Sequence, residues 1–283
     1  MIAPFLRWCI NTWISVTGRA VSYEAYPWLK GPMSKGLDIG DRYYDEVARQ
    51  EGLTVSHTST EGLIVSFDDV VDGAANAGKK VSQKVTDFYE RTAAYKLEVW
   101  SQWYAPIAFF ARVLIRSLST KMNQLNIPLQ PLETSHGMSN EVIQLKDAEG
   151  GVRYACWLRK SILTGRVVYA GFYSGIHIEG APFVRVVFPL PGGNVTVLLK
   201  VVVNDDGSVE LVSRGKGMGD AGYYRVQHSA AGKVKVRYIP IKERIHVYED
   251  AFGVLRTDHI FWFRKYKFLH LHYKIIPAGS GNA

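Results

Sequence analysis

The sequence predicts an α+β protein in which N-terminal helices cap a large antiparallel β-barrel or strongly curved sheet of about ten strands. Up to about residue 140 the apolar residues recur at helical spacing. The remainder consists of short runs rich in Val, Ile, Tyr and Phe, separated by turn signals at near-regular intervals. Strands joined by such short turns pair antiparallel. A sheet of that many strands curls or closes, because its exposed edges would otherwise promote aggregation.

The change of pattern near residue 140 divides the chain into a helical part and a β part. We expect a helical segment over 33–140 that packs on a sheet over 141–276, the two forming one domain, with a polar tail over 277–283. The segment that begins at Met33, "MSKGLDIGDRYYDEVARQEGL", resembles a natural start followed by an amphipathic helix. We therefore interpret residues 1–32 as an extension, not necessarily native, that stands outside the fold.

Three helices are expected in the first half of the chain. The first, over 39–51, begins after Asp38 as its cap and ends at Gly52. Its apolar face is formed by Ile39, Tyr43 and Val47. The second is expected over 82–103, because residues spaced by three or four positions form one stripe, namely Phe88, Thr92, Tyr95, Val99 and Trp103. The third begins at Pro106 and ends at 126–128.

The second half contains the predicted strands. They are EVIQL (141–145), VRYACWL (152–158), GRVVYAGFY (165–173), FVRVVF (183–188), VTVLLKVVV (195–203), SVELVS (208–213), YYRVQ (223–227), KVKVRYI (233–239), RIHVY (244–248), LRTDHIFWF (255–263) and FLHLHYKII (268–276). The run over 195–203 is apolar on both faces apart from Thr196 and Lys200. We therefore expect the barrel interior to cover one of its faces and the long helices to cover the other.

Charge and composition narrow the classes of partner. The chain has 34 basic and 26 acidic residues, a formal net charge of +8, which favours acidic or anionic partners. No nucleic acid is expected, since the basic residues are scattered and no nucleic-acid-binding motif occurs. No apolar stretch reaches the roughly 18 residues of a membrane span. With only Cys9 and Cys156, a disulfide framework is excluded and a reducing, cytoplasmic location is expected.

Four of the eight histidines lie between residues 246 and 274. Side chains alternate along a strand, so the neighbours Asp258 and His259 point to opposite faces and do not form an acid/base pair. His270 and His272 share one face, roughly 6–7 Å apart, a spacing that suits two ligands of one divalent metal.

A third metal ligand would have to come from a neighbouring strand. His246 and His259 are the candidates, and Glu243 and Asp258 are weaker ones. Lys274 lies on the same face as the two histidines and opposes a cation there. A structural or ligand-lining role for His246, His270 and His272 is therefore favoured over metal binding.

Two further motifs carry little weight. "GMGDAG" (217–222) has the glycine spacing of a dinucleotide loop, but "YYRVQ", a strand, follows it where the mechanism requires a helix. "ETSHGMS" (133–139) brings Glu133, Ser135 and His136 together in sequence, yet adjacent residues rarely form a catalytic triad. No Gly-x-Ser-x-Gly elbow is present, so we interpret this segment as a polar connector.

Aromatic residues indicate where a ligand would bind. Amphipathic aromatic side chains suit a pocket wall, although core packing is the simpler role for those of the second helix. The predicted ligand-binding residues are Tyr89, Tyr95, Trp100, Tyr169, Tyr173, Arg256 and His259. The function expected is binding of a lipid-like or other apolar or acidic small molecule in a barrel cavity. The alternative is a hydrolase or lyase acting on a small ester or lactone, metal-dependent through the strand histidines.

Several runs resemble those of a family of uncharacterised bacterial proteins. They are "FYERTAAYKLEVWSQW", "QLNIPLQPLETSHGMSNEV", "GRVVYAGFYS", "VVFPLPGGNVTVLLK" and "DAFGVLRTDH". The resemblance covers residues from about 35 to 276. It implies no activity and no catalytic residue, and it agrees with residues 1–32 being an extension.

Overall fold

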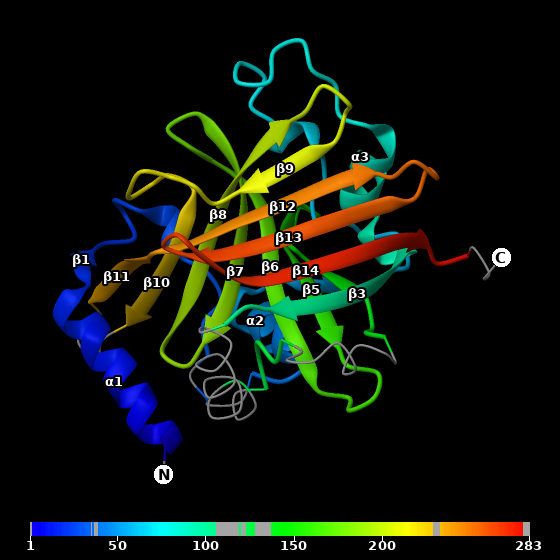
Figure 1. Ribbon diagram of the computed structural model, residues 1–283. Coiled ribbons are helices and arrows are strands. Elements are labelled where there is room, and N and C mark those ends of the chain that lie inside the picture. Colours follow the sequence, from blue (N-terminus) through cyan, green and yellow to red (C-terminus); the bar gives the residue numbers. More distant parts are fainter. Residues whose placement is uncertain are drawn as a thin grey trace.

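The computed structural model describes residues 2–34, 36, 39–105, 119, 123–127, 137–228 and 233–279, with the backbone alone for residues 2–7. Most of this part is antiparallel sheet, as expected for an α+β chain whose second half is rich in strands (Figure 1). The described α-helices are α1 (Ile2–Thr17), α2 (Tyr43–Glu51) and α3 (Gln83–Glu90). Short 3₁₀ turns cover Pro27–Leu29, Asp68–Val70 and Thr92–Ala94.

Fourteen strands form the sheet within these residues. They are β1 (Arg19–Val21), β2 (Thr54–Ser56), β3 (Tyr95–Trp103), β4 (Glu141–Lys146), β5 (Val152–Lys160), β6 (Val167–Ile178), β7 (Ala181–Leu190), β8 (Gly193–Val203), β9 (Val209–Val212), β10 (Gly222–His228), β11 (Val234–Ile239), β12 (Ile241–Glu249), β13 (Leu255–Phe263) and β14 (Tyr266–Pro277). The eleven predicted runs correspond to β4–β14, which confirms the β-rich second half. Three strands, β1–β3, lie in the half where none was expected.

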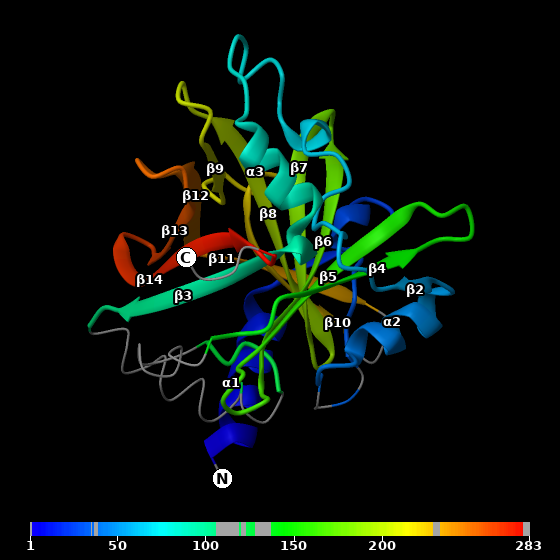
Figure 2. The ribbon, with the colours of Figure 1, turned by 90° about the vertical axis from the view of Figure 1, so that its right-hand side faces the viewer.

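The strand order shows a bent sheet with free edges. The main path is β2-β4-β5-β6-β7-β8-β9-β12-β13-β14-β3, and β10, β11 and β1 branch from β8. β8 is the corner, because Gly193–Leu199 pair with β7 while Lys200–Val203 pair with β9. In Figure 1, β12–β14 and β3 cross in front of β5–β8, and Figure 2 shows the two layers from the side. Within the described residues β2 and β3 do not pair with each other, so the closed form of the predicted barrel is not found.

The prediction of a helix over 82–103 is wrong in its second part. α3 ends at Glu90, and Tyr95–Trp103 form a strand that pairs with β14. Side chains of β3 alternate, with Leu97, Val99 and Ser101 buried. A step of four residues keeps one face in a helix and also in a strand, whose period is two, so the stripe could not distinguish them. The buried positions halfway between, Leu97 and Ser101, mark the strand.

Side chains connect β3 to the opposite region of the sheet. The Asn140 side-chain amide donates to the carbonyl oxygens of Thr92 (2.8 Å) and Tyr95 (2.7 Å), just before β4 begins. From β5, Arg159 Nη2 donates to the Leu97 carbonyl oxygen at 3.3 Å. These bonds hold β3 near β4 and β5 where no backbone ladder forms in the described part.

The predicted first helix is confirmed in part as α2, which begins at Tyr43 after Arg42 as its N-cap and not after Asp38. Gly52 has a φ of +68°, the left-handed conformation that ends a helix most readily at glycine. Tyr43 and Val47 are buried and pack with Ile39 against β4–β6. Asp38, the predicted cap, lies outside the described residues, as does most of the third predicted helix, from Pro106 onward.

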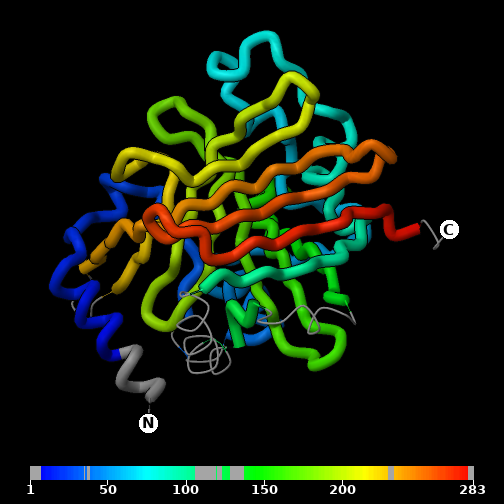
Figure 3. The backbone as a smooth tube through the Cα atoms, in the orientation of Figure 1, coloured from blue at the N-terminus to red at the C-terminus, as the bar shows by residue number. Residues whose placement is uncertain are grey.

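Residues before Met33 pack on the sheet. β1 pairs with β11, and α1 lies along β10 and β11 at one end of the molecule (Figure 3). Trp28 and Leu29 are buried together with Leu198, which faces outward from β8. The outer face of this part of β8 is therefore covered by residues 27–29, and not by the long helices that were expected there.

Candidate functional site

A cavity of about 550 Å³ lies between the two layers of the sheet. Residues of β3 and of every strand from β5 to β14 line it, together with α3. Most of the lining is aliphatic or aromatic, and the polar groups are Arg159, Glu243, Thr257, His259 and several tyrosine hydroxyls. A volume of this size, apolar with a few polar groups, is typical of small-molecule sites.

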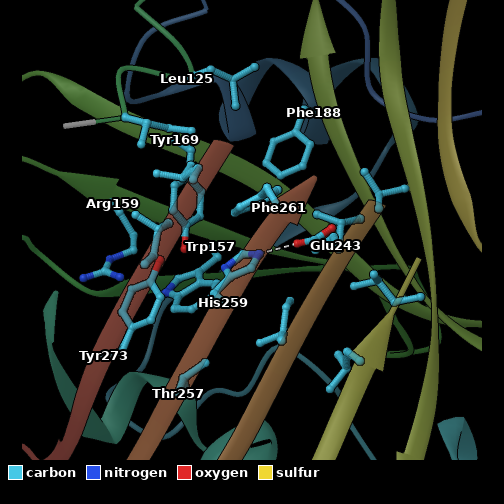
Figure 4. A pocket seen from close by; sticks show the side chains of 18 of the residues that line it. Leu125, Trp157, Arg159, Tyr169, Phe188, Glu243, Thr257, His259, Phe261 and Tyr273 are labelled. Atoms are coloured by element: carbon cyan, nitrogen blue, oxygen red, sulfur yellow. Dashed lines mark hydrogen bonds and ion pairs between the residues drawn. The ribbon is translucent and has the colours of Figure 1, made fainter. Parts of the chain in front are cut away.

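Glu243 and His259 form a buried pair inside this cavity (Figure 4). Glu243 Oε1 lies 2.5 Å from His259 Nε2, and the side chains are 7% and 15% exposed. The Tyr223 hydroxyl donates to Oε2 of Glu243, so both carboxylate oxygens have a partner. The Glu243 backbone N–H donates to Ser213 Oγ at 2.7 Å, which fixes this point of β12. Because a carboxylate only accepts, the hydrogen bond places a proton on His259 Nε2.

The alternation of two neighbouring strands brings this pair together. On β12 the inward positions are Ile241, Glu243, Ile245 and Val247, and on β13 they include Thr257, His259 and Phe261. Glu243 is opposite Phe261, and His259 is opposite Ile245. The acid and the imidazole are thus diagonal neighbours on the cavity face, within reach of each other across the two strands.

The second ring nitrogen of His259 has no hydrogen-bond partner among the described residues. The imidazole packs between aromatic rings, with centroids 4.2 Å from Phe261 and 6.4 Å from Tyr273. With Nε2–H bound to the carboxylate, Nδ1 carries the free lone pair whenever the ring is neutral. An imidazole held by a carboxylate in this way can act as a base.

Arg159 is a fully buried cation beside two aromatic side chains of the cavity, Trp157 and Tyr273. Its guanidinium lies 5.6 Å from the Trp157 ring centroid and 5.7 Å from that of Tyr273. Its hydrogen bonds go to the backbone oxygens of Leu97 and Ser139. In the part of the chain that the structure describes, no carboxylate forms an ion pair with it. In Figure 4, His259 lies between Glu243 and the group of Arg159, Trp157 and Tyr273.

The cavity tyrosines are protonated at neutral pH. Burial raises the pKa of Tyr273 to about 12, and the nearby Arg159 offsets part of that rise. Burial also raises the pKa of four other cavity tyrosines far above the usual value for a tyrosine, namely Tyr89, Tyr169, Tyr173 and Tyr223. Their hydroxyl groups therefore remain available to donate hydrogen bonds inside an apolar space.

Four of the seven predicted ligand-binding residues line the cavity: Tyr89, Tyr169, Tyr173 and His259. The other three do not. Tyr95 packs against Phe88, and Trp100 is 46% exposed on the outer face of β3. Arg256 pairs with Asp250 at 2.8 Å, also on the outer face of its strand.

His246, His270 and His272, which were considered as candidate metal ligands, lie on the outer face. His270 Nε2 and His272 Nδ1 lie 2.9 and 3.0 Å from the same Asp258 oxygen, and His246 contacts Ser208 at 3.1 Å. Strand parity is confirmed, because His259 points into the cavity and Asp258 points away from it. His259 and Glu243 are therefore wrong as partners for this face. Within the described ranges, no three His, Cys, Asp or Glu side chains form a group that could hold a metal.

The two weaker motifs give no site. "GMGDAG" leads directly into β10, so it opens no helix and provides no dinucleotide cradle. Glu133, Ser135 and His136 lie outside the described residues.

Glu243 and Arg159 line the cavity although the sequence did not predict either of them there. Glu243 could have been found, since it interrupts an inward stripe otherwise made of Ile241, Ile245 and Val247. An acid at such a position must be paired, because an isolated buried carboxylate is costly. Arg159 carried no comparable signal, since "VRYACWLRK" has no strict alternation that would place it inside.

No helix among the described residues is both long and apolar enough to cross a membrane. Comparisons with models of protein families, with curated proteins and with solved structures find no match to this chain.

Proposed function

We propose that this protein binds a predominantly apolar small molecule that carries one polar group. The observation that supports it best is the cavity of about 550 Å³, whose lining is apolar except for one concentrated set of polar side chains. Empty apolar volume costs stability, and a native fold that retains this much of it gains from a ligand that fills it. The cavity also has the few convergent polar groups on an apolar wall that mark small-molecule sites.

The polar side chains would orient the ligand. Its apolar part would lie against the inward faces of β7 and β8, where Val186, Val197 and Leu199 contribute only aliphatic surface. Its polar group would meet His259, the tyrosine hydroxyls and Arg159 on the other side. Arg159 has no carboxylate partner among the described residues, which favours an acidic or carbonyl oxygen over a cationic group.

Titration with cis-parinaric acid, a fluorescent fatty acid, tests the proposal. Trp157 lines the cavity, so a molecule bound there should quench tryptophan emission as its own fluorescence rises. We expect saturable binding of one molecule per chain, displaced by excess oleate. Emission that does not saturate, or that oleate does not displace, would count against a ligand site.

The Glu243–His259 pair favours an enzyme as the second candidate. The alternative of a hydrolase or lyase was expected to depend on metal at His246, His270 and His272, but these lie on the outer face away from the cavity. An acid/base function at His259 needs no metal and uses the same cavity as the ligand.

A further inference from the structure

We propose that His259 is a general base that removes a proton from carbon, next to a carbonyl group, in an apolar molecule bound in the cavity. This inference rests on the proposed function, because it places the reacting molecule in the same space. It adds a reaction class, proton transfer, and a substrate class, carbonyl compounds with an acidic C–H group.

The orientation of His259 supports this role. Glu243 Oε1, 2.5 Å from Nε2, fixes the ring and its tautomer, and Tyr223 in turn fixes Glu243. Nδ1 is left without a hydrogen-bond partner in the described part of the chain. When the ring accepts a proton at Nδ1, the adjacent carboxylate stabilises the imidazolium that forms.

The surroundings of His259 favour a carbonyl compound. Removal of a proton beside a carbonyl leaves an electron pair that moves onto the carbonyl oxygen, where a hydrogen-bond donor must stabilise it. The Tyr273 ring centroid is 6.4 Å from the His259 ring centroid, and the Arg159 guanidinium lies 5.7 Å from the same tyrosine centroid. The phenol, which remains protonated at neutral pH, supplies a donor without competing as a base.

The reaction is balanced without a cofactor. His259 Nδ1 takes the proton, the C–H electron pair forms the enolate C=C bond, and the carbonyl π pair moves to oxygen. In a substrate with a C=C bond next to the α-carbon the anion is a dienolate, and the imidazolium returns the proton to its far carbon, which gives the conjugated isomer and regenerates the neutral ring. Nothing is oxidised or reduced, and Glu243 neither gains nor loses a proton in these steps.

The base can be tested without knowing the natural substrate. 5-Nitrobenzisoxazole is small, flat and apolar, and it opens when a base removes its ring C–H proton. The C–H electron pair completes a nitrile, the N–O bond breaks, and the single product is a coloured cyanophenolate. We expect the protein to open this ring at least about 100-fold faster than an equal concentration of free imidazole, since a positioned base contributes about that much.

Three variants separate catalysis from folding. H259Q keeps an N–H donor for Glu243 but has no basic nitrogen, and its rate should fall to that of free buffer. H272Q removes a histidine from the outer face of the neighbouring strand and should leave the rate unchanged. E243Q should give an intermediate rate, because it keeps the shape of the side chain but removes the charge that stabilises the imidazolium.

Parinarate binding by each variant serves as the second measurement. If H259Q still binds parinarate, even with lower affinity, but has lost ring opening, the loss is due to the missing base and not to unfolding. Equal ring-opening rates in wild type and H259Q would overturn the base, and the binding proposal would stand. If the wild type does not bind parinarate at all, the binding proposal is overturned instead.

Discussion

Glu243 and His259 lie on adjacent strands, 2.5 Å apart at Oε1 and Nε2, on the concave face of a sheet whose outer face carries the remaining histidines of this region. The pair is set in apolar surroundings, with Ile245 and Phe261 as its cross-strand neighbours. Tyr223 completes it by donating to the second carboxylate oxygen. The arrangement separates one imidazole, held in a cavity, from three that face outward.

Replacing His259 by leucine should destabilise the protein by about 3 kcal/mol, because it leaves the buried Glu243 carboxylate without its main partner. The matched change His272→Leu should cost no more than about 1 kcal/mol, since Asp258 keeps water and His270 as partners. Urea unfolding measures both changes. Equal losses of unfolding free energy in the two variants would mean that the Glu243–His259 pair stabilises the fold no more than the outward-facing Asp258–His272 pair does.

Asn140→Ala should loosen β3. It removes the two hydrogen bonds to the carbonyl oxygens of Thr92 and Tyr95, and it leaves the Trp157 indole N–H without its acceptor at 2.5 Å. We expect a loss of about 2 kcal/mol and faster amide exchange in Leu97 and Val99. Asn204→Ala, which removes a bond confined to a turn, is the control. Unchanged amide exchange in β3 would show that the hydrogen bonds from Asn140 do not stabilise this strand.

Acidification should destabilise the packing of the N-terminal segment. Burial, aided by the charge of Arg225, lowers the pKa of His228, which is hydrogen-bonded to Tyr23. A histidine with a lowered folded pKa is neutral in the fold and takes up its proton more readily once unfolded. Its contribution to stability is therefore present above about pH 6.5 and declines as the pH falls below that value.

The His228→Gln variant tests this pH dependence. Between pH 7.5 and 5, thermal unfolding of the variant should change less than that of the wild type. His177→Gln, at an exposed position of β6, should keep the wild-type dependence. A variant at position 228 with the full wild-type pH dependence would exclude His228 as its source.

The second half of the fold could be predicted because its signals are local. Each of β4–β14 is a β-prone run between turn residues, and strand parity alone placed His259 apart from Asp258. Local sequence patterns do not show which residues of two strands lie opposite each other, so the pairing of His259 with Glu243 was not predicted. The prediction of a helix over 95–103 failed for another reason. Tyr95, Val99 and Trp103 share a face in either a helix or a strand.

The role of residues 19–29 was also beyond local patterns. The segment pairs with β11 and covers Leu198 only through contacts more than 150 residues distant in sequence. The open edges of the sheet could not be predicted either. β3 is held near β4 and β5 by side-chain hydrogen bonds from Asn140 and Arg159, and local patterns do not show such long-range contacts. Such long-range contacts determine whether a curved sheet encloses a cavity.

The most direct test of the central claim, that the cavity binds an apolar ligand, compares two tryptophan substitutions on one strand. Val197 points into the cavity from β8, whereas Val202 on the same strand is 40% exposed. V197W should fill part of the cavity and weaken parinarate binding at least about tenfold, equivalent to about 1.4 kcal/mol. V202W should bind like the wild type, with near-ultraviolet circular dichroism confirming that both variants are folded. Equal affinity in folded V197W and V202W would contradict a ligand site between the two layers of the sheet.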